Sequence, residues 1–308
     1  RDQPRSRGLG DVYKRQMEDR EVLGEEEMRK RILDRLMFVF LLVVTIIALS
    51  PLVLIVLNLV RLGARYISWD LVSTYPRNLG REGGVLNAII GSFVLIAVSL
   101  TFSLPLCLGA AIYLTEFMKN RKLRDIADFL IEVLAGIPSI VFGIFGYYLF
   151  VYILGLGFSL ISASLTLSLM MIPIMLRTIE ETLDLVPKEI KLSAYALGAT
   201  EWDTTWRVTV RVALPGIITG CLLSIGRILG ETAPLILTTG YNFRAPRSFL
   251  EGVATLTFTI YEYIELGAAY PELMGKAAAV GLILIMIILT IDFVTLYLSK
   301  RLIKVMLI

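Results

Sequence analysis

Long blocks of apolar residues, separated by shorter polar segments, form the main pattern along this chain. Each block is about 20 residues or more, the length that an α-helix needs to cross roughly 30 Å of hydrocarbon. The pattern predicts an all-α fold, a polytopic bundle of six membrane-spanning helices. We expect these helices at about 36–60, 86–115, 127–153, 158–176, 214–238 and 276–299.

Two segments precede the first apolar block. Residues 1–16 come before the first methionine, Met17, and contain neither apolar periodicity nor the apolar core of a signal peptide. We expect them to be an artefactual extension. Residues 17–35 are dense in charge and are expected to form a cytoplasmic N-terminal segment. Residues 36–308 then make up the transmembrane domain.

The distribution of basic residues predicts how the helices are oriented. Cytoplasmic loops of membrane proteins carry an excess of lysine and arginine. Counted from Met17, 17 basic residues fall on the side that carries both chain ends, and 6 fall on the other side. Both termini are therefore expected in the cytoplasm.

The composition supports a membrane protein and excludes several kinds of chemistry. Hydrophobic residues make up 56% of the 308 residues, and the mean hydropathy is +0.75. There is no histidine, and Cys107 and Cys221 both lie in apolar blocks, so the pattern indicates no metal site and no disulfide framework. The sequence contains no G-x-x-x-x-G-K-[S/T] motif and no nucleophile with a paired base in the spans. We expect neither catalytic residues nor a bound cofactor, and any ATP hydrolysis would belong to a partner chain.

The fifth apolar block contains two opposite charges, Arg227 and Glu231, four residues apart. A charge at mid-membrane is costly, so it normally faces a protein interior or an aqueous path. On a continuous helix the two side chains share one face, about 6 Å apart along the axis. Gly226 and Gly230 remove bulk from that face, and Pro234 leaves a carbonyl without its helical partner. One interpretation is a path for a polar solute; the other is a self-neutralising ion pair beside a Gly-x-x-x-Gly packing surface.

Further positions extend the predicted path and its moving parts. Ser139, near the start of the third span, has a hydroxyl that can donate to an anion, and Thr232 directly follows Glu231. Prolines occur in five of the spans, and each removes a backbone hydrogen bond that lipid cannot replace. We assign hinge or packing roles to Pro138, Gly230 and Pro234.

The polar segment 186–206 is expected to form two short helices on the cytoplasmic side. Pro187 suits a helix start, Gly198 suits a helix end, and the hydroxyl of Thr200 can cap the next helix. Two helices that meet at a glycine form a knob that fits the groove of a partner. The alternative is an amphipathic hairpin that lies on the lipid headgroups.

This loop resembles the signature of permeases in binding-protein-dependent ABC importers. That signature is Glu-Ala-Ala, three residues and Gly, on the loop that contacts the ATPase. Residues 193–200 match it, and the resemblance assigns ATPase coupling to Ser193, Ala194, Gly198, Ala199 and Thr200. The chain departs from the signature at two places: Leu192 stands at the glutamate position, and Val210-Arg211 stand where Leu-Pro is usual. The missing carboxylate calls one polar contact to the ATPase into question, but not the docking geometry.

Two further motifs narrow the resemblance. Ala-Gly-Ile-Pro-Ser-Ile-Val-Phe-Gly (135–143) and Gly-Glu-Thr-Ala-Pro-Leu (230–235) are similar to the PstA-type permeases of phosphate importers. The resemblance implies a type I ABC importer permease fold in a bacterial or archaeal cytoplasmic membrane. It implies a PstC-like second permease, two PstB-like subunits that use ATP and magnesium, and a PstS-like phosphate-binding protein outside. It also implies that Arg227 and Glu231 matter for phosphate passage.

These inferences predict a permease that moves phosphate by alternating access. Arg227 offers planar donors suited to phosphate oxygens. Glu231 would repel the anion, so we expect it to hold Arg227 in one state and to release it in another. The alternatives are a permease for molybdate, sulphate or phosphonate, a channel or carrier without an ATPase, and a membrane-embedded enzyme.

Overall fold

The computed structural model describes the backbone of residues 5–306 and the side chains of residues 30–298. It divides the chain into two units, residues 1–58 and 59–308. The first unit lies mostly in helix α1 (Arg5–Gly63), which contains an apolar stretch long enough to cross a membrane. The expected extension 1–16, and most of the charged segment that follows it, lie outside the residues whose side chains are described.

The second unit consists of helices whose connections are mostly short, with a longer segment, 239–255, between α10 and α11. Three π-helical turns follow α3, α5 and α8, at Tyr113–Phe117, Tyr147–Ile153 and Thr205–Thr209, and two 3-10 turns lie at Ala64–Tyr66 and Asn78–Gly80. The α-helices of this unit are α2 (Trp69–Ser73), α3 (Leu86–Ile112), α4 (Arg121–Gly136), α5 (Ser139–Gly146), α6 (Leu160–Asp184), α7 (Lys188–Ala196), α8 (Glu201–Thr204), α9 (Val210–Leu229), α10 (Ala233–Thr238), α11 (Leu256–Gly267) and α12 (Glu272–Met306).

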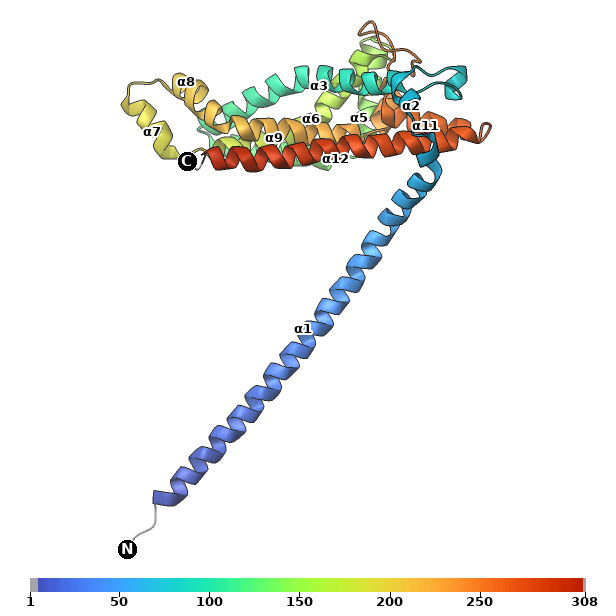
Figure 1. Cartoon of the computed structure of the whole chain (residues 1–308). Helices are drawn as coiled ribbons and strands as arrows, with labels where there is room; N and C mark the ends of the chain where they lie inside the picture. The colour runs from blue at the N-terminus through green and yellow to red at the C-terminus, as the bar shows by residue number, and fades with distance from the viewer. Residues whose placement is uncertain (1–4, 307–308) are drawn as a thin grey trace. The chain divides into compact units, whose positions relative to one another are not determined.

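The long helices of the second unit run along one common direction (Figure 1). Helix α6 packs between α3 and α9, and α12 packs on α9 and α11. Helices α7 and α8 lie at one end of this bundle, and α2 and α11 lie at the other. The bundle therefore separates the predicted cytoplasmic loop from the segments predicted on the opposite side of the membrane.

Helix α6 is the centre of the core. In its apolar stretch 67% of the residues are buried, about twice the 33% in the stretches of α3 and α9, so neighbours surround α6 on most sides. One fully buried stripe recurs at every fourth residue, which is the spacing that keeps side chains on one helix face. Its members are Leu167, Met171, Met175, Ile179 and Leu183.

The third expected span, 127–153, is not one straight helix. Helices α4 and α5 meet at a bend of 95°. Pro138 disfavours helical backbone at the preceding residue, and Ile137 accordingly has extended angles of φ −71° and ψ 129°. Five helices of the described chain are long and apolar enough to cross a membrane, or six if the bent pair counts as one span.

Close packing of α5 on α10 depends on Gly143. A Cβ atom added there would lie 2.8 Å from the Cα of Pro234, a backbone atom that cannot move aside. We expect Gly143→Ala to lower the free energy of unfolding by about 1–3 kcal/mol, the usual cost of overpacking. Thermal unfolding of the purified chain measures this.

Gly136 provides the matched control for that variant. A Cβ atom at Gly136, at the end of α4, would have no neighbour within 4 Å. Because alanine restricts the unfolded chain, Gly136→Ala is expected to leave stability unchanged or to raise it by up to about 1 kcal/mol. Equal losses in the two variants would contradict the packing argument.

Candidate functional site

Helix α9 ends in the middle of the fifth expected span, so residues 214–238 do not form one helix. The helix stops at Leu229, and Gly230 and Glu231 donate to the carbonyls of Arg227 and Ile228 at 3.2 and 3.0 Å. The chain is non-helical from Gly230 to Thr232 and resumes as α10. Pro234 lies in the first turn of α10, where no intrahelical N–H donor is needed. The expectation that Pro234 leaves a carbonyl unpaired inside a continuous helix is therefore wrong.

The structure confirms that Arg227 and Glu231 come together, although not on one helix face. Arg227 Nε lies 4.0 Å from Glu231 Oε1, and the Arg227 side chain is 49% exposed whereas that of Glu231 is 17% exposed. Because Glu231 lies beyond the helix end, its position depends on the break rather than on helical spacing. The pair is loose, and its cation remains open on one side.

Thr257 on α11 holds this break in place. Its hydroxyl donates to the Glu231 carbonyl at 2.9 Å, and the residue is 6% exposed. Ser92 on α3 accepts from the backbone N–H of Leu256 at 3.0 Å, which fixes the start of α11 beside the break. A cavity of about 10 Å³, near the lower limit for one water, lies between these elements. The sequence pattern missed Thr257 because it falls between the expected spans 214–238 and 276–299.

Removing the Thr257 hydroxyl tests its role at the break. In Thr257→Val the partly buried Glu231 carbonyl loses its donor, so we expect a loss of about 1–3 kcal/mol in unfolding free energy. Thermal unfolding of the purified chain measures the loss. Thr257→Ser keeps the donor and is expected to unfold close to the unmodified chain. A serine variant as unstable as the valine variant would show that packing, not the hydrogen bond, matters here.

The other two residues that were predicted to line the path lie on different elements. Ser139 is the first residue of α5 and is half-buried beside the bend. Thr232 occupies the N-cap position of α10, and its hydroxyl makes no capping bond. Among the described side chains, no hydrogen bond or ion pair joins Ser139 or Thr232 to Arg227. The structure thus pairs only Arg227 and Glu231 directly.

Segment 186–206 forms the two expected short helices, α7 and α8. Gly198 ends the first with φ of +85°, a left-handed conformation that suits glycine. The Thr200 hydroxyl caps the second by accepting from the Asp203 N–H at 3.1 Å. Pro187 occupies the N-cap position of α7. These local signals explain why the sequence predicted this part of the fold.

The loop presents large apolar side chains to its surroundings. Leu197, at the end of α7, is 90% exposed, and Leu192 and Trp202 are also more than half exposed. Exposed apolar and aromatic groups on a rigid knob are typical of a surface that binds another protein. The Ser193 hydroxyl donates to the Glu189 carbonyl one turn earlier, so it is already used within α7.

An ion pair anchors this loop to the bundle. Lys191 Nζ lies 2.6 Å from Oε1 of Glu116, in the turn that follows α3, and both side chains are mostly buried. A pair this sheltered from water is screened little by salt. Burial, reinforced by the carboxylates of Glu201 and Glu116, raises the pKa of Tyr195. Glu116 therefore fixes the position of α7.

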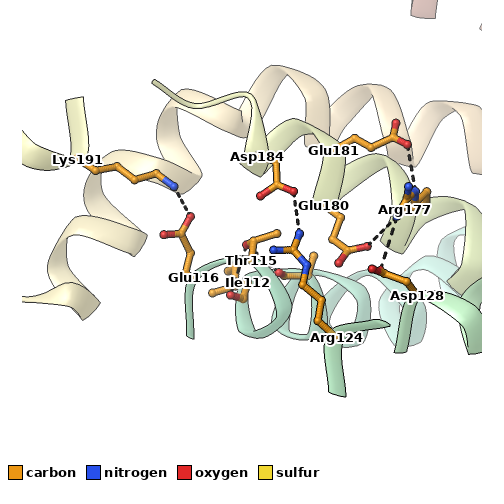
Figure 2. A network of polar contacts seen from close by, with 11 residues as sticks. Ile112, Thr115, Glu116, Arg124, Asp128, Arg177, Glu180, Glu181, Asp184 and Lys191 are labelled. Atoms are coloured by element: carbon orange, nitrogen blue, oxygen red, sulfur yellow. Dashed lines mark hydrogen bonds and ion pairs between the residues drawn. The ribbon is translucent and has the colours of Figure 1, made fainter. Parts of the chain in front are cut away.

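A second group of charges ties α4 to the end of α6 (Figure 2). Arg124 donates to Asp184 at 2.8 Å. Arg177 reaches three carboxylates, with the shortest separation 3.1 Å to Glu181. One of the three, Glu180, is 3% exposed and has no hydrogen-bond partner among the described side chains. The network joins residues about 60 positions apart, so the local pattern gave no sign of it.

Sequence comparisons show that this chain is similar to transport proteins. Residues 103–304 match the family described as binding-protein-dependent transport system inner membrane component. The phosphate transport system permease protein PstA of Mycobacterium leprae is 36% identical over 275 residues, covering 87% of this chain and 88% of the relative. PstA of Haemophilus influenzae is 36% identical over 218 residues, covering 71% of this chain and 77% of the relative.

Solved structures agree on the fold. A bacterial alginate ABC transporter, solved with a periplasmic protein bound to an alginate pentasaccharide, has a chain that aligns with a TM-score of 0.61 at 17% identity, covering 88% of this chain and 96% of its own. A chain of the inward-facing methionine transporter MetNI aligns with a TM-score of 0.55 at 20% identity, covering 71% of this chain and 94% of its own.

Proposed function

Because this chain belongs to the family of binding-protein-dependent transport system inner membrane components, with relatives of the PstA type, we propose that it is the permease subunit of an ATP-driven phosphate importer. It is a multi-pass protein of the inner membrane with the type I importer fold. The observation that carries the proposal is the break after α9, which places an exposed arginine beside a sheltered carboxylate within the bundle.

Arg227 binds phosphate during passage. Its guanidinium carries a permanent charge and planar donors that match phosphate oxygens. Glu231, held by Thr257, pairs with Arg227 when phosphate is absent and releases it when phosphate arrives, so no bare charge is left. The 4.0 Å separation is compatible with such an exchange because the pair is not tightly bonded. Ser139 and Thr232 add hydroxyl donors along the path.

The α7–α8 knob transmits the motion of the ATPase. Its exposed apolar surface fits a partner's groove, and the Lys191–Glu116 pair connects it to α3. ATP and magnesium are used by two PstB-like partner subunits, and this chain binds no cofactor. A PstC-like permease completes the membrane part, and a PstS-like protein delivers phosphate from outside. The excess of basic residues places α7, α8 and both termini in the cytoplasm.

A reconstituted uptake assay tests the proposal. The chain is co-expressed with the neighbouring permease, ATPase and binding-protein genes, and labelled phosphate is followed in the presence of excess sulphate, molybdate or phosphonate. We expect ATP-dependent phosphate uptake that these competitors do not reduce. Uptake of a competitor instead of phosphate would support the permease function and reject phosphate as the substrate. Uptake without ATP in a verified assembly would contradict the assigned role of the α7–α8 knob.

A further inference from the structure

A cleft with three arginines lies at the end of the bundle opposite the α7–α8 knob. It has a volume of about 600 Å³ and forms between two loops that are far apart in the sequence. One loop follows α2 and the other follows α10, and both lie near the end of the bundle that carries α2 and α11 (Figure 1). The lining residues are Tyr75, Pro76, Arg77, Phe243, Arg244, Ala245, Pro246 and Arg247.

Within the described part of the chain, no ion pair neutralises the three guanidinium groups of the cleft. Arg77, Arg244 and Arg247 are exposed, and none forms an ion pair within the part of the chain whose side chains are described. Two carboxylates flank the cleft and keep their negative charge, so three arginines against two acids leave a net positive charge there. Glu82 accepts from an asparagine side chain at 2.8 Å, and Glu251 accepts from the backbone N–H of Arg247 at 2.9 Å.

The backbones that carry these arginines are fixed in place. Arg77 and Arg247 each follow a proline, which restricts the chain before them. The backbone of Arg77 also pairs with that of Glu82 across a tight turn, at 2.9 Å and 3.2 Å. The Arg244 N–H donates to the side chain of Asn242 at 3.0 Å. Because the backbones are fixed, only the arginine side chains have to be ordered when a ligand binds.

We infer that this cleft binds a phosphate-type oxyanion at the outer mouth of the protein. Guanidinium groups bind phosphate oxygens through paired hydrogen bonds. A cleft lined by one sign of charge also raises the local concentration of the opposite ion. A site here holds the anion ahead of the path that starts at the break after α9. The choice of phosphate as ligand, and the outer location, rest on the proposed function.

Protection from arginine modification tests the site directly and needs no transport. The full chain in its assembly is placed in nanodiscs of zwitterionic lipid and labelled with phenylglyoxal, and each arginine is followed by peptide mass spectrometry. Inorganic phosphate at ten times its dissociation constant is expected to slow labelling of all three arginines about tenfold relative to chloride of equal ionic strength. Arg207, which is exposed in the knob at the other end, is the control and is expected to keep its rate.

Further labelling experiments identify the source of the oxyanion. Nanodiscs that contain phosphatidylglycerol test a lipid headgroup, and protection by that lipid without protection by free phosphate assigns the site to the headgroup. Equal labelling rates in phosphate and in chloride would overturn the oxyanion site. The remaining occupant of the cleft would then be an acidic protein surface. Protection by sulphate but not by phosphate would reject phosphate as the ligand.

A variant with Arg77, Arg244 and Arg247 all changed to Gln links the cleft to transport. We expect it to raise the phosphate concentration for half-maximal uptake severalfold and to leave the maximal rate unchanged. An unchanged half-maximal concentration would show that the cleft does not supply the path. Absence of uptake in the unmodified assembly would count against the proposed function alone, since the labelling experiment is read independently.

Discussion

Arg227→Gln is expected to lower ATP-dependent phosphate uptake at least about 100-fold, because two charge-assisted hydrogen bonds of about 1.5–3 kcal/mol each are lost. Glutamine keeps a polar amide donor but is shorter and has neither the charge nor the planar fork. Loss of the arginine also leaves Glu231 as an unpaired carboxylate that repels the anion. Uptake of labelled phosphate by the reconstituted assembly measures the effect.

Two variants separate the role of the charge from a general disturbance. Arg227→Lys keeps the charge without the fork and is expected to retain part of the uptake. Arg211→Gln changes an exposed arginine near the other end of the same helix, and it is expected to transport normally. Assembly with the ATPase is checked by co-purification in each case. Normal uptake by an assembled Arg227→Gln protein would reject the proposed path.

Gly198→Val is expected to reduce co-purification of the ATPase about tenfold or more, because a β-branched residue at positive φ costs roughly 1–3 kcal/mol and displaces the backbone. Gly198 sets the angle between α7 and α8, with φ of +85°. No atom lies within 4 Å of a Cβ added there, so the effect is one of backbone conformation rather than of a steric clash.

Gly155→Val is the matched control for this variant. Gly155 has φ of +64° and the same open surroundings, but it precedes the first residue of α6, whereas the knob follows the last residue of that helix. It is expected to carry a similar strain without affecting ATPase binding. If both variants lost the ATPase equally, or if neither did, the α7–α8 knob would not be the coupling surface.

The local signals of the sequence were enough to predict the α7–α8 knob. Proline before α7, glycine between the helices and threonine at the cap each act on their immediate neighbours in the chain. The structure contains all three features where the pattern indicated them. The sequence also indicated that Arg227 and Glu231 meet, but it assumed one continuous helix, whereas the structure pairs them across the end of α9.

The interruption between α9 and α10 was not predictable in the same way. Residues 214–238 are mostly apolar and carry no charge besides the Arg227–Glu231 pair, so hydropathy favours one span. The break is stabilised by a hydroxyl from Thr257, which is 26 positions away, and α10 packs against α5 through Gly143. Neither contact can be recognised from the residues that neighbour the break in the sequence.

The sequence by itself therefore determined the membrane class, the approximate positions of the spans, the family and the two short helices of the knob. These properties follow from segment length, residue type and chain neighbours. Only the tertiary structure decided where the fifth span breaks, how Glu116 holds α7, and which charges join α4 to α6. Each of these depends on groups that are distant in the chain and that desolvate or pair with one another only when the bundle has packed.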